Sequence, residues 1–256
     1  MKKFALLALM ATAAAHAYSQ DTIRFGVEAQ FPPFESKTSA GKLVGFDIEL
    51  GDAICAQMKA KCQWVENSFD GMIPALKAKK FDAILSSMSI NEERMKQIDF
   101  SDKLYNTPIG LIVGKKSGIK PQLQVLKGKR VGVLQGSIFE TYAKQKWAPN
   151  GVTVVSYQST DLVYADLVAG RLDAALDDAV AADAGLLKKP DGKGFMLASP
   201  TVHDDKIFGP GTGIGLRKED TALRQKINHA IAAILKNGTY KTIEKKYFAF
   251  DVYNAK

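Results

Sequence analysis

Serine hydroxyls and one arginine stand close together about a third of the way along the chain. Ser86, Ser87 and Ser89 follow a short apolar run that has the form of a buried strand. Arg94 comes shortly after them in a short helical segment. A guanidinium group is a planar fork of donors that matches a carboxylate, although an exposed helix charge is the alternative for Arg94. The pattern predicts a site where hydroxyl, backbone N–H and guanidinium groups bind a small carboxylate.

Aromatic and acidic side chains occur in nearby loops. Phe31 follows the first predicted strand and Phe69 directly precedes a predicted helix. Two such rings could sandwich a flat or cationic group, although core packing is the ordinary place of a Phe. Glu28 ends the first strand, beside Phe31. Its carboxylate suits the distal cation of lysine or arginine, and an exposed strand-end Glu is the equally common alternative.

A second group of candidates lies further along the chain. Asp178 ends an apolar strand and could accept hydrogen bonds from an ammonium group or cap the next helix, and one role does not exclude the other. Leu134, Gly136 and Ser137 form a strand-to-helix turn, and N–H groups at a helix N-terminus favour an anion.

The two groups of candidates follow two copies of one pattern. Residues 76–87 read LKAKKFDAILSS and residues 167–178 read LVAGRLDAALDD, preceded by RFGV at 24–27 and RVGV at 130–133. Helices that alternate with short apolar runs indicate βαβ units, and ligands of open α/β sheets sit beyond the carboxyl ends of the strands. The repeat therefore predicts two α/β lobes with a polar ligand between them, although FDA and LDA could also recur by chance.

Each half is predicted to alternate strands and helices. In the first half we expect strands at 22–28, 62–66 and 82–86, and helices at 47–60, 71–79 and 91–97, with a loop at 31–42. In the second we expect strands at 130–134, 152–156 and 173–176, and helices at 138–146, 161–169 and 178–188. Helices at 220–236 and 239–247 close the chain.

Two extended segments are predicted to connect the lobes. Segment 104–114 leaves the first lobe, and segment 206–217 returns to it, so that the terminal helices pack on the first lobe. Two such crossings form a hinge, and hinged lobes close around a ligand. Four alternating glycines in the return segment suit a hinge or a close-packed strand, because their spacing is wrong for a dinucleotide-binding loop.

The start of the chain has the form of a secretory signal peptide. Two lysines precede an apolar stretch and the small-x-small sequence Ala15-His16-Ala17, which predicts cleavage after residue 17. A retained amphipathic anchor is the alternative, because the stretch is shorter than the roughly 20 residues of a membrane span. The predicted mature product is soluble and exported.

Charge and cysteine content narrow the functional classes. The formal charge of +8 is scattered among acids, and we expect no nucleic-acid partner because there is no basic stripe with interleaved aromatics. We also expect no metal, since histidines and cysteines are few. Cys55 and Cys62 are close in sequence, and in an exported protein such a pair is most simply a disulfide.

Several motifs together resemble one family, the periplasmic amino-acid-binding proteins of ABC importers (solute-binding protein family 3). The resemblance spans Asp21 to Tyr253 and is greatest to the lysine/arginine/ornithine- and histidine-binding branch. It is carried by the segments FPPFES, VGFDIELGDAIC, DGMIPALKAKKFDAILSSMSI, RVGVLQGS, GRLDAALDDAVAA, GTGIGLRKED and NGTYKTIEKKYFAFDVY. It implies an α/β, two-lobed type II ("Venus flytrap") fold with two hinge-crossing strands. After the signal peptide (1–17), lobe one would comprise 18–107 and 209–256, and lobe two 108–208.

The resemblance also assigns roles to residues. It implies that Arg94 and the Ser87–Ser89 region hold the α-carboxylate and α-ammonium groups, with Asp178 completing the ammonium site. It places Ser86, Phe69, Leu134 and Phe31 around the side chain of the ligand, with Glu28 at the far end. It implies a Cys55–Cys62 bridge and a structural role for Asp47. The turn residue Ser137 and its neighbours Ile138 and Phe139 complete the expected site.

The chain departs from the family pattern where specificity would be set. Basic-amino-acid binders often carry Asp where this chain has Glu28 and Tyr where it has Phe31. After the turn they usually have polar residues, whereas this chain has Ile138 and Phe139. These changes make the pocket more apolar and let the acidic side chain reach further in. The preferred side chain therefore stays open.

The function expected from these features is binding, without a cofactor and without catalysis. A monomeric receptor in the periplasm would capture arginine, ornithine, lysine or histidine and present it to an inner-membrane ABC permease. The alternatives are a receptor for another polar amino acid or an opine, a sensor that reports to a membrane partner, and a periplasmic cyclohexadienyl dehydratase. The dehydratase would need a general acid, for which Glu28 is the single candidate.

Overall fold

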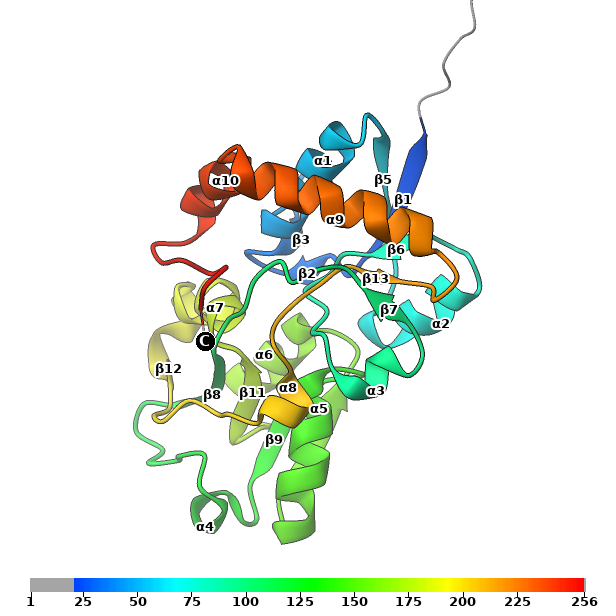
Figure 1. Ribbon diagram of the computed structural model, residues 1–256. Helices are drawn as coiled ribbons and strands as arrows, with labels where there is room; N and C mark the ends of the chain where they lie inside the picture. The colour runs from blue at the N-terminus through cyan, green and yellow to red at the C-terminus, as the bar shows by residue number, and fades with distance from the viewer. Residues whose placement is uncertain (1–20, 256) are drawn as a thin grey trace, which may run out of the picture.

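The computed structural model describes residues 21–255 as two α/β lobes joined by two crossing segments (Figure 1). The predicted signal peptide, 1–17, lies outside the described residues. Each lobe contains one five-stranded sheet with helices packed on it. The predicted two-lobed α/β fold is confirmed.

The sheet of the first lobe collects strands from both ends of the chain. Its order is β5-β1-β6-β13-β7. The strands are β1 (Thr22–Val27), β5 (Lys61–Glu66), β6 (Ala83–Ile84), β7 (Asp99–Phe100) and β13 (Gly215–Leu216). β1 pairs in parallel with β5 and β6, whereas β13 lies antiparallel between β6 and β7. The return segment therefore inserts its end into the first sheet.

Helices from both ends of the chain pack on this lobe. They are α1 (Phe46–Gln57), α2 (Met72–Lys77), α3 (Glu92–Met95), α9 (Thr221–Lys236) and α10 (Thr239–Tyr247). Both α9 and α10 contact α1, as predicted for the terminal helices. The buried face of α9 consists of Ile227, Ala230, Ile231 and Ile234, whose spacing of three and four residues forms one apolar stripe.

The sheet of the second lobe has the order β10-β9-β11-β8-β12. Its strands are β8 (Ile109–Gly114), β9 (Arg130–Leu134), β10 (Thr153–Tyr157), β11 (Ala174–Asp178) and β12 (Phe195–Leu197). Its helices are α4 (Leu123–Leu126), α5 (Ile138–Tyr142), α6 (Thr160–Val168), α7 (Ala179–Ala182) and α8 (Asp205–Phe208). β8 forms the end of the first crossing segment and pairs antiparallel with β11.

Several local expectations were wrong. The segment expected to be a loop at 31–42 contributes to a small antiparallel sheet of β2 (Gln30–Phe31), β3 (Glu35–Lys37) and β4 (Leu43–Val44). The helices expected at 138–146 and 178–188 change to π-helical geometry after α5 and α7, at Ala143–Trp147 and Asp183–Leu187. The start of the return segment is helical, since it forms α8.

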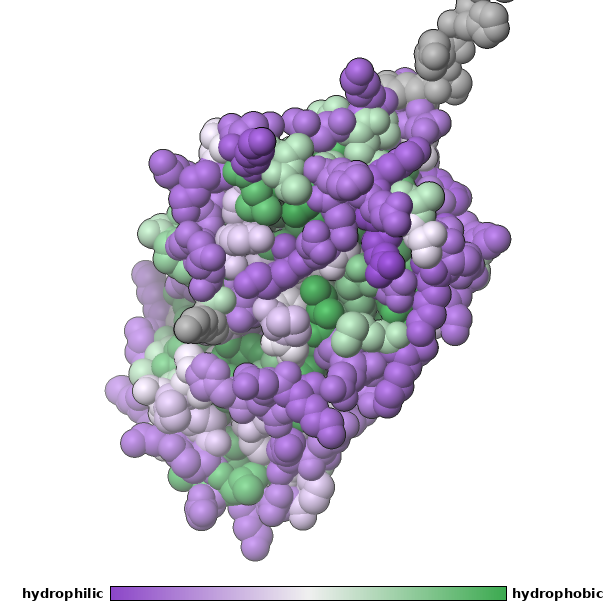
Figure 2. Space-filling model, viewed as in Figure 1, coloured by the Kyte–Doolittle hydropathy of each residue, from purple (hydrophilic) through white to green (hydrophobic). Residues whose placement is uncertain are grey.

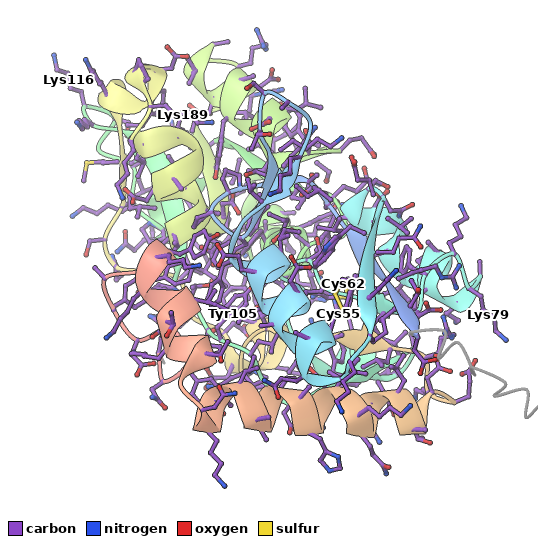
Figure 3. The ribbon with its side chains drawn as sticks, turned by 90° about the horizontal axis from the view of Figure 1, so that it is seen from above. Cys55, Cys62, Lys79, Tyr105, Lys116 and Lys189 are labelled. Carbon is purple, nitrogen blue, oxygen red and sulfur yellow. A yellow bond between two sulfur atoms is a disulfide. The ribbon has the colours of Figure 1, made fainter. Side chains whose placement is uncertain are left out.

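The two cysteines form the expected disulfide. Cys55 lies near the end of α1 and Cys62 near the start of β5, with their Cα atoms 5.8 Å apart (Figure 3). The bridge ties α1 to the edge strand of the first sheet. Such a short loop stabilises a fold by about 2–3 kcal/mol in the chain-entropy model.

The crossing segments run through the waist of the molecule. Figure 2 shows hydrophobic atoms at this waist, with further hydrophobic atoms among the hydrophilic surfaces above and below it. Gly209 and Gly211 have positive φ, and a Cβ at Gly209 would lie 1.7 Å from the Ile90 carbonyl oxygen. The return segment thus packs backbone against backbone, which explains its glycines.

Within residues 21–255, the structure contains no helix that is long and apolar enough to cross a membrane. In the same range, no group of three or more His, Cys, Asp or Glu side chains is placed to hold a metal ion.

Candidate functional site

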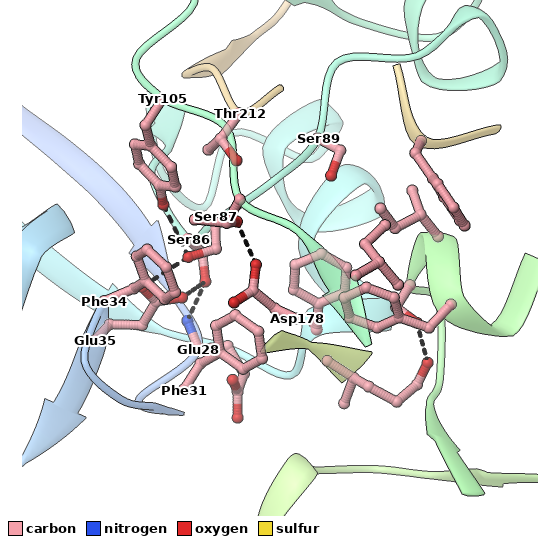
Figure 4. Close-up of a pocket in the computed structure, with 18 of the residues that line it drawn as sticks. Glu28, Phe31, Phe34, Glu35, Ser86, Ser87, Ser89, Tyr105, Asp178 and Thr212 are labelled. Atoms are coloured by element: carbon pink, nitrogen blue, oxygen red, sulfur yellow. Dashed lines mark hydrogen bonds between the residues drawn. The ribbon is translucent and has the colours of Figure 1, made fainter. Parts of the chain in front are cut away.

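One pocket lies between the lobes, and every candidate ligand-binding residue lines it (Figure 4). The sequence-predicted members are Glu28, Phe31, Phe69, Ser86, Ser87, Ser89, Arg94, Leu134, Ser137, Ile138, Phe139 and Asp178. They come from strand ends and turns of both lobes, as expected for ligands of α/β sheets.

Arg94 is held in place by backbone carbonyls from both lobes. It lies in α3, whose N-cap Asn91 accepts a hydrogen bond from the Arg94 backbone N–H. Its side chain donates to the carbonyl oxygens of Ser89 (2.8 Å) and Gly136 (3.2 Å). The guanidinium carbon lies 5.4 Å from the centre of the Phe69 ring. With Arg94 only 8% exposed, the alternative of a solvated helix charge is wrong.

Asp178 caps the helix that follows it, which is one of the two roles that its position suggested, and it also lines the pocket. It ends β11, and its Oδ1 accepts from the backbone N–H groups of Val180 (2.8 Å) and Ala181 (2.9 Å), which caps α7. Its Oδ2 accepts from the hydroxyl of Thr107, in the first crossing segment. Burial raises the pKa of Asp178 to about 6.

The serines after β6 form a polar floor. Ser86 Oγ accepts from the backbone N–H of Glu28 (2.9 Å) and donates to Glu35 Oε1 (3.1 Å). Ser87 has a left-handed backbone, with φ of 49°, and its N–H donates to Asp47 Oδ2 at 2.8 Å. Ser89 pairs through its backbone with Thr212 of the return segment in an isolated antiparallel β-bridge. The N–H of Ser87 is thus already bonded, and its hydroxyl is hydrogen-bonded to Glu35 Oε2 and to the Tyr105 hydroxyl.

Glu28 and Phe31 lie on the first-lobe side of the pocket. Glu28 directly follows β1 and is 5% exposed, so the alternative of a solvated strand end is wrong. Burial raises its pKa to about 7, against a hydrogen bond from the Gln30 backbone that favours the ionised form. Phe31 is buried and stacks on Phe34 at 5.7 Å between ring centres, which combines core packing with pocket lining.

The turn after β9 forms the second-lobe side. Ser137 caps α5 by accepting from the Glu140 N–H at 3.1 Å. The Gly136 N–H donates to Glu140 Oε2 at 2.7 Å, so this N–H is not available to an anion. Ile138 and Phe139 are both buried and give this side an apolar surface.

Sequence reasoning missed a further set of pocket residues. They are Phe34, Glu35, Tyr105, Asn106, Thr107, Ile109, Phe208 and Thr212. Most lie on the crossing segments, which necessarily form the back of a cleft between two lobes, so this position was a usable signal. Glu35 had no such signal, because β3 brings it to the pocket through an antiparallel pairing that the sequence did not reveal.

The charge of the pocket is unbalanced. Three of its lining side chains are carboxyl groups, those of Glu28, Glu35 and Asp178, and Arg94 is its one cation among the described residues. Burial lowers the pKa of Arg94 to about 10, which leaves it charged at neutral pH. A zwitterion that brings a further positive charge would compensate this excess of acid.

The lobes touch at the rim of the pocket. Besides the Arg94–Gly136 bond, the Gln135 amide donates to Asp70 Oδ2 at 3.1 Å. A Cβ on Gly136 would lie 2.7 Å from the Cα of Asp70, so the two backbones are in close contact. These contacts describe a closed arrangement of the lobes.

This fold, with its pocket between two lobes, defines a class of binding proteins that close around a small ligand. The chain belongs to the bacterial extracellular solute-binding proteins, family 3, which it matches over residues 23–250.

Its relatives include proteins with defined ligands. It is 51% identical to the histidine-binding periplasmic protein of Escherichia coli (strain K12), over 99% of each chain. It is 52% identical to the lysine/arginine/ornithine-binding periplasmic protein of the same organism, over 97% of this chain and 95% of that protein. The structure of an ancestral arginine-binding protein bound to arginine is similar with a TM-score of 0.83 and 38% identity, over 90% of this chain and 99% of that one.

Proposed function

We propose that the protein captures a basic L-amino acid (arginine, ornithine, lysine or histidine) in the periplasm and delivers it to an ABC permease. The observation that carries this proposal is the charge of the pocket, where three buried carboxyl groups face one guanidinium. An amino acid with a cationic side chain has one carboxylate for Arg94 and two cations for the acids. The names of the relatives support the same class of ligand.

In the proposed pose, the ligand spans both lobes. Arg94 and the hydroxyl of Ser89 bind its α-carboxylate, and Ser87 lines the pocket beside them. Asp178 accepts hydrogen bonds from the α-ammonium group, since Thr107 and the α7 cap already fix its orientation. The aliphatic stem lies between Phe31 and Phe69, and the distal cation reaches Glu28.

The remaining contacts tune the choice of side chain. Ser86, Leu134, Ser137, Ile138 and Phe139 enclose the middle of the ligand. Since Ile138 and Phe139 bring no polar atom of their side chains, recognition of the distal cation falls mainly on Glu28. Binding at this site needs no cofactor and involves no catalysis.

The same proposal covers the organisation of the mature protein. Cleavage after residue 17 exports a monomer whose lobe one comprises 18–107 and 209–256 and whose lobe two comprises 108–208. The segments near 107 and 209 act as the hinge. The partner is the inner-membrane permease, and nucleic acid has no part.

A ligand screen tests the function. Protein that has been unfolded, stripped of ligand and refolded is heated with each of the twenty amino acids, ornithine, citrulline and octopine. Ligand at 100 times Kd adds about 2.7 kcal/mol of stability, which raises Tm by several degrees. We expect the shift with basic amino acids, and calorimetric titration then ranks them.

Other outcomes would replace the proposal. A shift confined to a neutral amino acid or octopine would mean that Ile138 and Phe139 have changed the specificity. Release of phenylpyruvate from prephenate, or of phenylalanine from arogenate, would make the protein a dehydratase. If ligand binds but deletion of the permease leaves uptake intact, the protein is a sensor and not a transport receptor.

A further inference from the structure

Two carboxyl groups meet in a buried network directly under the pocket floor. Glu35 of β3 is 1% exposed and Asp47 of α1 is fully buried. The two carboxyl groups are connected through Ser87, whose N–H donates to Asp47 Oδ2 and whose hydroxyl is hydrogen-bonded to Glu35 Oε2. Two buried carboxylates in one network repel one another, which favours a proton on one of the two.

The hydroxyl groups beside Glu35 and Asp47 also indicate that one of the two carboxyl groups carries a proton. Glu35 Oε2 lies 3.2 Å from Ser87 Oγ, Ser87 Oγ lies 2.9 Å from the Tyr105 hydroxyl, and this hydroxyl lies 2.7 Å from Asp47 Oδ1. These are three oxygen–oxygen hydrogen bonds in a row (Figure 4 draws the serine and tyrosine members). Ser87 and Tyr105 supply one hydroxyl proton each, so the third proton belongs to a carboxyl group at one end of the row.

Among the described residues that shift the pKa values of Glu35 and Asp47, none is a cation that would compensate their negative charge. The groups facing it are Glu28 after β1, Ser86 and Ser87 after β6, Tyr105 of the first crossing segment and Tyr240 of α10. On α10, Lys246 pairs with Glu49 of α1. Burial, the repulsion within the pair and the charge of Glu28 raise the pKa of Glu35 well above its usual range. Burial also raises the pKa of Asp47 to about 6.

Glu35 connects this pair to the ligand site, because it also lines the pocket. We propose that Glu35 and Asp47 share one proton in the ligand-free protein and that a cationic ligand displaces this proton to solvent as it binds. The inference rests on the proposed function and makes the pair a further determinant of specificity. Binding exchanges one positive charge for another: the ligand cation enters, and the proton leaves to the buffer.

The exchange has a consequence for selectivity. A ligand with a cationic side chain favours the doubly ionised pair, so its affinity rises with pH until the pair has lost its proton. When a ligand of the same shape with a neutral side chain binds, the pair keeps its proton in a larger fraction of the protein molecules. Arginine and citrulline form such a pair of probes, since they share the α-carboxylate and α-ammonium groups.

Calorimetry in buffers of different ionisation enthalpy measures the protons released per ligand bound. The Glu28→Gln background removes the other acid expected near the distal cation. In that background, Asp47→Asn places an amide where the acid was, and the amide donates the hydrogen bond without a titrating proton. At about pH 6, we expect L-arginine to release up to one proton more from Glu28→Gln than from Glu28→Gln/Asp47→Asn.

A matched control is Glu28→Gln/Glu49→Gln, which makes the same change on the outer face of the same helix and should keep the full release. Equal proton release from all three proteins would overturn the proposal. If Asp47→Asn does not fold, Glu35→Gln supplies the same amide donor from the other side of the network.

Infrared spectra of the ligand-free protein separate this inference from the proposed function. With ¹³C in the Asp or Glu carboxyl groups, a protonated acid gives a carbonyl band that shifts with the label and disappears in Asp47→Asn or Glu35→Gln. Absence of that band at neutral pH would remove the shared proton, whatever the ligand. If the band is present but no basic amino acid binds, the proposed function fails and the shared proton stands.

Discussion

At the scale of single residues, the pocket holds more buried carboxyl groups than cations among the described residues. Arg94 has its side chain fixed by carbonyls of both lobes, and Asp178 has its side chain fixed by the α7 cap and Thr107. The bond from Arg94 to Ser89 and the bonds from the α7 cap to Asp178 each lie within one lobe, so they orient both side chains independently of lobe closure and lower the entropy lost on binding. Glu28 is also buried, and none of the described residues that shift its pKa is a cation.

Removal of the guanidinium should abolish most of the affinity. In Arg94→Ala, the ligand carboxylate is buried without its partner, and breaking a buried pair costs about 3–5 kcal/mol. Calorimetric titration with arginine checks this value, and circular dichroism checks the fold. The control Arg24→Ala removes an arginine that pairs with Asp82 in the first lobe away from the pocket lining, and should bind normally. Near-normal affinity of Arg94→Ala would place Arg94 outside the site.

Glu28 should distinguish cationic from neutral ligands. Glu28→Gln removes the charge but keeps the size, so arginine should lose about 1.5–3 kcal/mol of binding, the usual value of a hydrogen bond to a charged group. Citrulline should lose much less. The control is Glu66→Gln, an exposed acid that lies outside the pocket lining. Equal losses for both ligands would show that Glu28 does not contact the distal group.

At the scale of elements, the turns at strand ends bring the lobes together. The β9–α5 turn approaches the short helical turn Phe69–Gly71 so closely that a Cβ at Gly136 has no room. Gly136 also has φ of 75°, which favours glycine. Gly136 is therefore needed for two reasons. The turn requires its positive φ, and the contact between the closed lobes leaves no room for a side chain.

The two requirements can be separated by substitution. Gly136→Ala should weaken ligand binding at least tenfold, because the methyl group meets the Asp70 backbone and keeps the lobes apart. Gly170→Ala is the control, since Gly170 has a similar φ of 72° but no atom within 4 Å of its would-be Cβ. Titration gives the affinities, and small-angle scattering with ligand should find Gly136→Ala more extended. Equal effects of the two substitutions would assign the loss to backbone strain.

At the scale of the whole molecule, the cleft concentrates buried acids in a protein with a positive formal charge of +8. Burial raises the pKa of Asp178 to about 6 and that of Glu28 to about 7. Burial also raises the pKa of Asp177, which accepts from the Tyr164 hydroxyl, to about 8. The folded, ligand-free protein therefore binds more protons than the unfolded chain, whose acids titrate at about 4.

The sign of the pH dependence follows from these raised values. The contribution of these groups to stability is fully present below the unfolded pKa and is lost as pH rises through about 6 to 8. We expect the urea concentration at the unfolding midpoint of ligand-free protein to decrease as pH rises from about 6 to about 8. Asp177→Asn should flatten the decline near its upper end. A midpoint that rises with pH over this range would contradict the raised pKa values.

Much of the architecture could be predicted because it is local. The repeated helix–strand pattern gave the two lobes, and the residues at strand ends had to face the cleft, since the carboxyl ends of parallel strands meet at one edge. Arg94 and Asp178 were found by side-chain type and position in this pattern. The π-helical continuations of α5 and α7 were missed, because they depend on packing after the first helical turn.

By itself, the sequence determined the α/β class, the two crossings, the disulfide partners and a set of side chains that all line one pocket. Periodicity and short spacing carry this information, since helices, strands and their ends depend on neighbouring residues. The tertiary structure alone decided that Glu35, Asp47, Ser87 and Tyr105 meet under the pocket floor. These residues come from a small sheet, a helix, a strand end and a crossing segment, and no local pattern states which distant segments pack together.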